Sequence, residues 1–387
     1  MDFDLSDEQQ SFVSVVRSFV DDAIRPNAER WDLEGELPLD AVEQMAGLGL
    51  FGLPFPERYG GAGGDLVTLC LAIEEIARVD SSLAITLEAA VGLGAMPVYR
   101  FGTEEQKATW LPPLVSGDAL AGYGLTEAGG GSDAGATRTT AVLDEGEWVI
   151  DGSKSFITNS GTPITSLVTI TALTDKGGES EEPKEISAII VPAGTQGFDV
   201  GPAYRKMGWR HSDTHELAFH DCRVPEANLL GRRGDGLRNF LAILDDGRIA
   251  IAALAVGLAQ GCLDECLRYA GERQAFGRAI GGYQAISFKI ADMATRTELA
   301  RTAYLKAAWL KGKGRPYTKH AAMAKLFASE TAVEVARDAV QVHGGYGYIE
   351  EFPVCRHFRD SKILEIGEGT SEIMRMLIAR ELGLPPS

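Results

Sequence analysis

The chain has 387 residues, of which 45% are hydrophobic and 24% are charged, and its formal net charge at pH 7 is -18. This composition is typical of globular proteins, and the length allows roughly two or three domains. The excess of acidic residues argues against nucleic acid or an anionic membrane surface as a partner, because both carry negative charge. An anionic ligand would need a local group of cations.

The N-terminal residues 1–8 are acidic and lack the basic and apolar regions of a secretory signal peptide. No apolar run approaches the length of a membrane-spanning helix, so we expect no membrane insertion. The five cysteines are scattered without a CxxC pair, which predicts reduced thiols in a cytoplasmic protein. They are Cys70, Cys222, Cys262, Cys266 and Cys355.

Residues 1–120 predict an N-terminal helical domain. A capping box at residues 6–9 precedes apolar residues at helical spacing, and a second box at residues 103–106 opens a helix before the proline pair 112–113. Further helical stretches are expected near residues 39–48 and 65–93.

Residues 121–231 predict a middle β-domain, either a barrel or a sandwich, because short β-rich runs alternate with turn signals. Residues 148–150 and 155–158 flank Asp151 and Gly152, which suggests a hairpin at that point. Further strands are expected at residues 167–173, 186–191 and 215–219, with a polar loop at residues 175–185.

Residues 232–387 predict a C-terminal four-helix bundle of the up-and-down type, so the fold class is mainly α with a central β-domain. The candidate helices cover residues 237–270, 283–311, 318–342 and 370–382, with breaks at residues 312–316 and 344–347.

Two motifs match known patterns by their letters only. Residues 47–52 read G-x-G-x-x-G, but a helix precedes them and prolines follow, whereas a dinucleotide fingerprint needs a strand before and a helix after. Residues 215–220 place two histidines one residue too far apart for a helical zinc motif, and their alternation predicts a strand. We therefore predict no metal site.

Glu368 stands between two glycines just before the helix expected at residues 370–382. Thr370 or Ser371 can cap that helix, which leaves Glu368 on irregular backbone. Because neither glycine has a side chain, a flat ligand can lie against the carboxylate. The alternative is that Glu368 contacts no ligand and is only stabilised by the positive N-terminal end of the helix dipole.

Residues 123–133 form a glycine-rich loop where the first helical region meets the β-region. Three consecutive glycines let backbone N–H groups approach a ligand, and Thr126 and Ser132 add hydroxyl groups suited to phosphate or heterocycle edges. A flexible hinge is the alternative. Residues 156–158 offer an aromatic face and a hydroxyl on one strand, and residues 341–347 end a helix in glycines.

Together with Glu368, these segments resemble the acyl-CoA dehydrogenases over the whole length of the chain, most closely the short-chain and branched-chain enzymes. The matching segments are residues 125–127 through 131–133, 273–277, 284–286, 341–345 and 368–372. The resemblance implies FAD as cofactor, a homotetramer built as a dimer of dimers, and oxidation of an acyl-CoA thioester to its trans-2-enoyl form. It also implies an electron-transferring flavoprotein as partner.

Carried over position by position, the resemblance assigns the catalytic base to Glu368. The residues that it implies for FAD are Tyr123, Leu125, Thr126, Gly131, Ser132, Phe156, Ile157, Thr158, Arg273, Phe276, Gln284, Gln341, Val342, Gly344, Gly345, Thr370 and Glu372. Of these, the members between Arg273 and Gly345 would reach the FAD of a neighbouring subunit. The residues that it implies for substrate are Ser132, Asp245, Arg248 and Gly369.

Some relatives carry the base at the position just before the arginine that corresponds to Arg248, and here that position is Gly247. The assignment of Glu368 is therefore consistent, with Asp245 and Asp246 as weaker rivals.

Three departures from the family pattern matter. Gly367 replaces a common tyrosine and suggests branched or wider substrates, Phe156 replaces a common tryptophan beside the flavin, and Ala128 replaces a usual proline. Two alternative functions remain. One is an oxidase of the same fold that uses oxygen, and the other is a non-catalytic flavin-binding or acyl-CoA-binding subunit of a hetero-oligomer.

Overall fold

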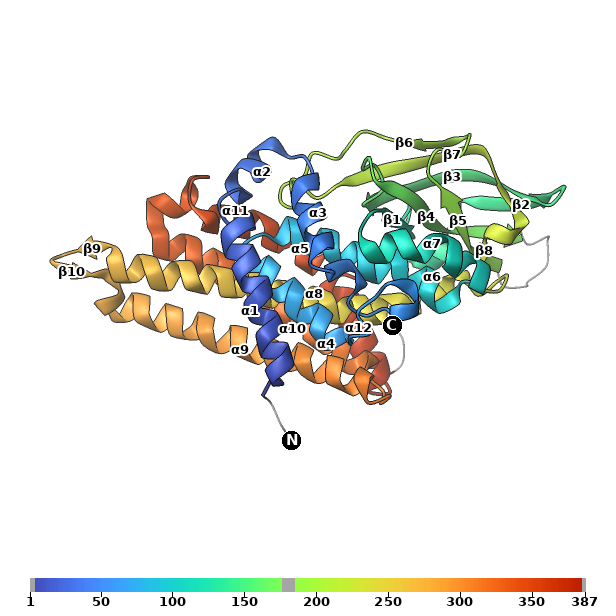
Figure 1. The fold of residues 1–387 in the computed structure, drawn as a ribbon. Coiled ribbons are helices and arrows are strands. Elements are labelled where there is room, and N and C mark those ends of the chain that lie inside the picture. The colour runs from blue at the N-terminus through green and yellow to red at the C-terminus, as the bar shows by residue number, and fades with distance from the viewer. Residues whose placement is uncertain (1–3, 176–184, 385–387) are drawn as a thin grey trace.

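The computed structural model describes residues 4–175 and 185–384. Helices of the N-terminal third, a central sheet and a set of long C-terminal helices follow one another along the chain (Figure 1). The sheet lies at one end of the molecule, and the long helices run from beside it to the opposite end, where strands β9 and β10 form a small hairpin (Figure 1). The fold class predicted from the sequence is confirmed.

Seven α-helices occupy the N-terminal part as far as it is described, from residue 4 onwards. They are α1 (Asp7–Phe19), α2 (Ala28–Glu34), α3 (Leu39–Gly47), α4 (Leu66–Ala77), α5 (Ser81–Glu88), α6 (Met96–Phe101) and α7 (Glu104–Ser116). Both predicted capping boxes are present, at Ser6 and at Thr103. The prediction that α7 stops before its proline pair is wrong, because the helix continues through Pro112 and Pro113 to Ser116 and is capped by Gly117, whose φ is +84°.

One stretch, Ser81–Phe101, is long and apolar enough to cross a membrane, so the prediction that no run approaches that length is wrong. It comprises α5, the π-helical segment η4 (Ala89–Ala95) and α6. Most of its 18-residue window, 83%, is buried inside the protein. This burial accounts for the apolar composition as that of a core helix.

Among the residues that the structure describes, the sheet contains eight strands in the order β6-β7-β3-β2-β4-β5-β8, with β1 parallel to β4. The strands are β1 (Leu120–Gly124), β2 (Thr140–Asp144), β3 (Glu147–Thr158), β4 (Thr165–Asp175), β5 (Glu185–Pro192), β6 (Phe198–Val200), β7 (Thr214–Pro225) and β8 (Leu229–Leu230). The predicted polar loop falls largely on residues 176–184, outside the described part of the chain.

The hairpin predicted at Asp151 and Gly152 is wrong. β3 runs without interruption through both residues and only shifts its register against β7 there. The turn lies earlier, between β2 and β3, where Glu145 has φ +49° and Gly146 has φ +87°. Positive φ at both central residues is the geometry that matches the twist of two paired strands.

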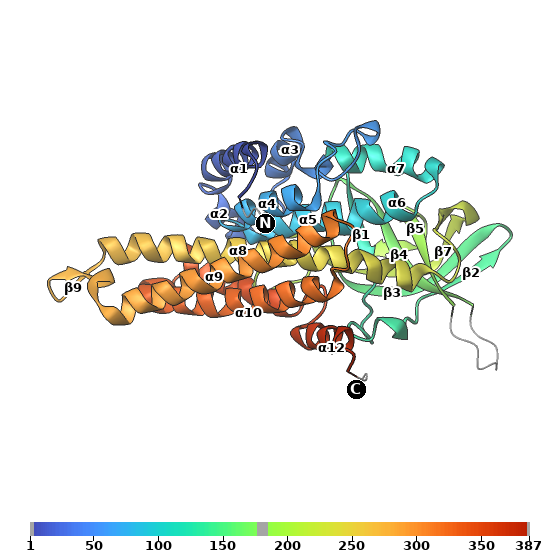
Figure 2. The same cartoon turned by 90° about the horizontal axis from the view of Figure 1, so that it is seen from below.

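Three long helices, α8 (Gly236–Glu272), α9 (Gln284–Gly312) and α10 (Thr318–His343), lie side by side in the C-terminal part (Figure 2). The shorter helices α11 (Pro353–Ser361) and α12 (Ser371–Glu381) follow, and α11 was not predicted. Helix α8 packs closely on α4, since a Cβ at Gly257 would lie 2.2 Å from the carbonyl oxygen of Glu74. This close packing fixes α8, which carries Gly247 and Arg248, against the N-terminal helices.

Candidate active site

The turn before α12 holds Glu368 in a strained conformation. Glu368 has φ +51° and Gly369 has φ +102°, so two successive residues adopt backbone that favours glycine. The side chain of Thr370 accepts a hydrogen bond from the N–H of Ile373 at 3.3 Å and caps α12, as the sequence predicts. A glutamate in the left-handed region costs roughly 1–2 kcal/mol, and such strain is concentrated at functional sites.

The carboxylate of Glu368 points into the protein. Both of its oxygens are inaccessible and have no hydrogen-bond donor among the described residues. A Cβ built on Gly247 would lie 2.1 Å from Glu368 Oε2. The structure therefore brings Glu368 against the position on α8 where some relatives carry the base, and the missing side chain of Gly247 makes room for the carboxylate.

A second carboxyl group, that of Glu88 at the end of α5, faces Glu368 and was not identified from the sequence. Its two oxygens are equally buried and without a donor among the described residues. Burial raises the pKa of Glu88 well above its ordinary value, and the neighbouring charge of Glu368 raises it further. Burial also raises the pKa of Glu368, although a proton held by Glu88 can be donated to Glu368 and opposes that rise.

Two buried cations lie near this pair of carboxyl groups. Lys325 of α10 donates a hydrogen bond to the carbonyl oxygen of Gly369 at 2.6 Å, and burial lowers the pKa of Lys325 to about 8. Arg248 forms an ion pair with Asp245, which also accepts a hydrogen bond from Thr318 at 3.0 Å. Each cation thus has its own partner, and neither donates a hydrogen bond to Glu368.

The two aspartates that the sequence leaves as rival bases are both engaged elsewhere. Asp245 is held by Arg248, and Asp246 accepts a hydrogen bond from Tyr317 at 2.7 Å and pairs with Lys311 at 2.5 Å. Of the three acids, only Glu368 has both oxygens buried without a donor among the described residues.

The glycine-rich loop is fixed at its base by Glu127. The carboxylate accepts hydrogen bonds from the N–H groups of Arg138 at 2.8 Å and Thr139 at 3.0 Å, and from the ammonium group of Lys154 at 2.8 Å. Burial is the largest influence on Glu127 and opposes its ionisation, but the charge of Lys154 and the hydrogen bonds from Lys154 and Thr139 together outweigh it, so the pKa of Glu127 lies below its ordinary value. This buried ion pair was not identified from the sequence, because Glu127 and Lys154 are 27 residues apart.

The predicted flavin segments from the loop and from β3 lie next to each other. The N–H of Ser155 donates to the carbonyl oxygen of Thr126 at 2.9 Å. Ser132 is exposed on the loop, whereas Phe156 protrudes from a register shift in β3 with φ +62° and a side chain that is 65% exposed. Ile157 is buried in the sheet core, and Thr158 ends the strand, half-buried, opposite Thr214 of β7.

Tyr123 is buried beneath this region. Its ring stacks on Phe240 of α8 at a centroid distance of 4.1 Å, and its hydroxyl group donates to the carbonyl oxygen of Phe240 at 2.8 Å. The side chain is thereby committed to the core, so a contact between Tyr123 and FAD would use its backbone.

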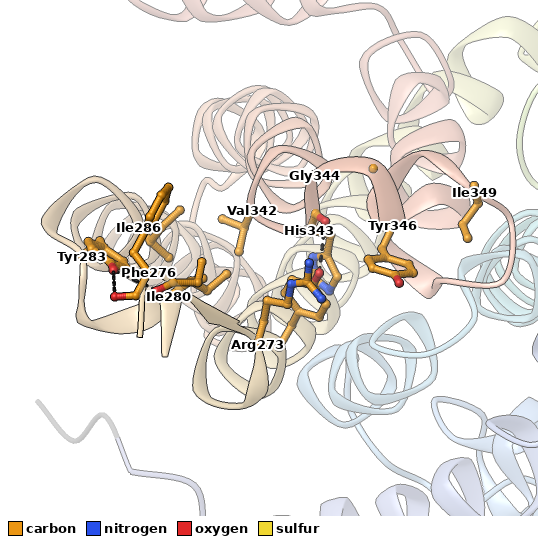
Figure 3. Close-up of a pocket in the computed structure, with 13 residues that line it drawn as sticks. Arg273, Phe276, Ile280, Tyr283, Ile286, Val342, His343, Gly344, Tyr346 and Ile349 are labelled. Carbon is orange, nitrogen blue, oxygen red and sulfur yellow. Dashed lines mark hydrogen bonds between the residues drawn. The ribbon is translucent and has the colours of Figure 1, made fainter. Parts of the chain in front are cut away.

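A second set of predicted cofactor residues gathers at the hairpin end of the bundle. Figure 3 shows side chains from the hairpin and from the end of α10 around one cavity of about 760 Å³. Its lining includes Arg273, Phe276, Val342, Gly344 and Gly345, but neither Gln284 nor Gln341, which are exposed. This cavity lies at the end of the chain's long helices opposite the sheet that carries the loop and β3, so one chain does not bring the two sets together (Figure 1).

The sequence also predicts that the protein has no metal site and that its cysteines are reduced thiols. Among the described residues, no cluster of three or more His, Cys, Asp or Glu side chains is arranged to hold a metal ion. All five cysteines are free thiols, as predicted, and only Cys355 is not fully buried.

Three family models match consecutive parts of the chain. The acyl-CoA dehydrogenase N-terminal domain matches residues 6–118, the middle domain residues 122–222 and the C-terminal domain residues 234–383. A probable acyl-CoA dehydrogenase of Bacillus subtilis (strain 168), YngJ, is 51% identical over 382 residues, which cover 99% of this chain and 100% of that protein.

Two solved structures are similar over their full length. Butyryl-CoA dehydrogenase from Megasphaera elsdenii has 42% identity and a TM-score of 0.95, covering 99% of this chain and 100% of that one. A chain in a structure described as the electron transferring flavoprotein of Acidaminococcus fermentans has 43% identity and a TM-score of 0.95, covering 99% of both chains. The chain therefore belongs to the acyl-CoA dehydrogenase family of flavoprotein oxidoreductases, which act on the CH–CH group of acyl-CoA in fatty acid β-oxidation.

Proposed function

We propose that this protein is an FAD-dependent dehydrogenase of short-chain acyl-CoA, straight or branched, that forms the trans-2-enoyl-CoA and passes electrons to an electron-transferring flavoprotein. The observation that carries the proposal is Glu368, whose carboxylate is buried, unpaired among the described residues and held on strained backbone. The 42% identity to butyryl-CoA dehydrogenase supports a short acyl chain. The structure described as an electron transferring flavoprotein supports the partner.

Glu368 is the proposed general base. The proton beside a thioester carbonyl is a weak acid, so a carboxylate removes it only when the developing enolate is stabilised. We assign that stabilisation to the backbone N–H of Glu368 itself. The hydrogen bond from Lys325 to the carbonyl oxygen of Gly369 holds the turn that follows this N–H group, and removal of water from the closed site strengthens both the base and the hydrogen bond to the enolate.

The residues around the loop and β3 fit a flavin. Phe156 stands on left-handed backbone, which is unfavourable for a bulky residue, and its ring stacks on Tyr204 but remains largely exposed, so a flat ligand can cover it. Thr158, two residues further along β3, and Ser132 on the exposed glycine-rich loop offer hydroxyl groups. When FAD is bound, it supplies the acceptor for the hydride that leaves the β-carbon.

The cavity at the hairpin end supports a homotetramer in which one chain completes the FAD site of another. Phe276 at the tip of the hairpin is 98% exposed, which is unfavourable for a phenylalanine in an isolated chain. Arg273 offers a cation beside Tyr346 for a phosphate group. Sedimentation of the purified protein tests the assembly. A Phe276→Asp variant should dissociate into smaller species with weaker FAD retention.

The function is tested with the purified protein under anaerobic conditions. The protein should be yellow, and butyryl-CoA or isobutyryl-CoA should bleach the flavin absorbance in a single turnover. A panel of acyl-CoA thioesters then ranks chain length and branching. Peroxide formed at the turnover rate in air would show an oxidase instead, and a colourless protein that takes up no FAD would contradict the proposal.

A further inference from the structure

A cavity of about 460 Å³ lies between α4, α8, α9 and the segment η4. Its volume falls within the range of small-molecule sites, which is roughly 300–1,000 Å³. Exposed residues such as Asp65 and Gly312 line the cavity, so it reaches the surface. The lining also includes the apolar residues Leu66, Leu69, Met96, Ala250 and Ala308. The cavity therefore offers space for an aliphatic group.

The wall between this cavity and the carboxylate of Glu368 is formed by Glu88 and Gly247. Both residues line the cavity, whereas Glu368 does not. A Cβ built on Gly247 would lie 2.1 Å from Glu368 Oε2 and 3.5 Å from Glu88 Oε1, so the two carboxyl groups meet at this glycine. Glu88 is 0% exposed, and its oxygens are as inaccessible as those of Glu368. The wall is therefore closed, and the proposed base lies directly behind it.

The side chain of Glu88 closes this wall, because the glycines next to it have no side chains. A Cβ built on Gly92 would lie 2.7 Å from Glu88 Oε1, and Gly247 flanks the same oxygen from α8. Gly92 belongs to η4, whose π-helical backbone is rare in proteins but frequent at functional sites. Truncating Glu88 would therefore join the cavity to the space around Glu368, since neither glycine can fill the gap.

The carboxyl group of Glu88 is not needed to hold the fold together. Neither oxygen has a donor among the described residues, so removal of the carboxyl group leaves no donor unpaired. Burying a carboxyl group without such a donor costs free energy, and an apolar side chain would fill the same space at a lower cost. A glutamate at this position beside the base therefore indicates a role in the site rather than in stability.

The proposed function directs the acyl chain towards this wall. The N–H group of Glu368 in the turn binds the thioester oxygen, and the carboxylate that takes the α-proton lies deeper, against Gly247. The carbon atoms of the substrate follow the same direction, from the thioester at the turn to the β-carbon and beyond. A chain that grows past the β-carbon therefore meets Gly247 and Glu88.

We propose that Glu88 ends the acyl pocket and so determines that the substrate has a short acyl chain. A butyryl group ends in front of the wall, whereas an octanoyl group needs the space that Glu88 occupies and the cavity behind it. This role of Glu88 rests on the proposed function and deepens it, because it assigns the chain-length limit to one side chain. Glu88 acts here by its volume, and a small residue in its place opens a pocket for longer straight-chain acyl thioesters.

The experiment measures single-turnover flavin reduction of the holoenzyme by butyryl-CoA and by octanoyl-CoA. The readout is the ratio of the octanoyl rate to the butyryl rate at equal, subsaturating thioester concentrations. A change in the basicity of Glu368 affects both substrates, so it cancels in this ratio. Glu88→Ala removes the wall, and Glu88→Gln is the matched control, because glutamine has the shape of glutamate and keeps the wall closed.

We expect Glu88→Ala to raise the ratio at least about tenfold, since each methylene group that reaches apolar space contributes roughly fourfold. Glu88→Gln should leave the ratio within about twofold of the wild-type value, which is less than the effect of one methylene group. Adding Gly92→Val to Glu88→Ala refills part of the gap and should lower the ratio again.

An unchanged ratio in Glu88→Ala, or an equal rise in Glu88→Gln, overturns this role of Glu88. A wild-type protein that octanoyl-CoA reduces as fast as butyryl-CoA also overturns it, and this comparison needs no variant to fold. A protein that neither thioester bleaches contradicts the proposed function instead. The wall is then judged from the Kd values of the two thioesters, measured by calorimetry and compared as the same ratio.

Discussion

Lys325 donates a hydrogen bond to the carbonyl oxygen of Gly369 at 2.6 Å and so joins the middle of the bundle to the turn that carries Glu368. The lysine is fully buried on α10. Burial disfavours its charged form and lowers the pKa of Lys325 to about 8. Because removing a cation from water costs free energy, a lysine buried at this place indicates that it positions the turn that carries Glu368. Its acceptor is the carbonyl oxygen of the residue after the base, and the left-handed backbone of Glu368 and Gly369 needs external support.

Replacing Lys325 with methionine should therefore lower kcat more than it raises KM. The substitution keeps the apolar stem but leaves the carbonyl oxygen of Gly369 without its donor, which costs about 1–3 kcal/mol of stability. Steady-state kinetics and urea unfolding measure the two effects. Lys306→Met on the exposed side of α9 is the control and should change neither. Equal kinetics in the two variants would remove Lys325 from this role.

Glu368→Gln should retain FAD and lose flavin reduction. The amide fills the same space but cannot take a proton, and loss of a general base typically costs about 10²- to 10⁴-fold. Stopped-flow reduction by butyryl-CoA measures the loss, and the flavin spectrum reports cofactor content. Glu365→Gln, three residues earlier and paired with Lys362, is the control. A Glu368→Gln protein that reduces its flavin within a few-fold of the wild-type rate would exclude Glu368 as the base.

Gly247→Ala tests the space that the base occupies. The added Cβ would lie 2.1 Å from Glu368 Oε2, so the carboxylate must move. A displacement of this size near the reacting atoms can cost about 10²-fold in rate. On the same helix, Gly271→Ala meets nothing within 4 Å and should raise stability by up to about 1 kcal/mol without loss of rate. Equal single-turnover rates in both variants would show that Glu368 does not depend on this space.

Local sequence patterns predicted the parts of the fold that depend on neighbouring residues. The capping boxes at Ser6 and Thr103 are present because each needs only a side chain and a backbone N–H three residues away. Glu368 was identified for the same reason, since its two glycines and the helix cap at Thr370 lie within three residues of it. The wrong hairpin at Gly152 arose because a register shift against β7 uses the same residue types as a turn.

Glu88 and Lys325 were missed because their importance depends on distant contacts. Glu88 is the only acid in the apolar stretch Ser81–Phe101, and that isolation was the one available indication. Its partner lies 280 positions further along the chain, and no helical or strand period links them. Lys325 reads as an ordinary lysine of a helix, and only the packing of α10 beneath the turn buries it. A single charge inside an apolar helix therefore indicates a buried partner or a site, because burying an unpaired charge is costly.

Glu127→Ala should destabilise the protein and weaken FAD binding together. It leaves the ammonium group of Lys154 buried without its partner and frees the N–H groups of Arg138 and Thr139. Breaking a buried pair in this way costs about 3–5 kcal/mol. Adding Lys154→Met to Glu127→Ala should recover stability, because no unpaired charge is left buried. It should not recover FAD affinity, because the loop still lacks the hydrogen bonds to Glu127. Thermal unfolding and FAD titration of apoprotein measure both, and full recovery of FAD affinity would contradict the role of Glu127.

Glu88→Gln should change how stability depends on pH. The pKa of Glu88 in the folded protein is raised well above the ordinary value of 4.5, so the native state keeps a proton that the unfolded chain releases. Native protein then binds more protons than unfolded protein, and stability falls as pH rises from 4.5 towards the folded pKa, by at most about 1.4 kcal/mol per pH unit. Glutamine at residue 88 removes this proton from both states. Urea unfolding at increasing pH above 4.5 should show the variant gaining stability relative to the wild-type protein. Parallel curves for the two proteins would mean that Glu88 is ionised in the native state, and the shared proton with Glu368 would then be excluded.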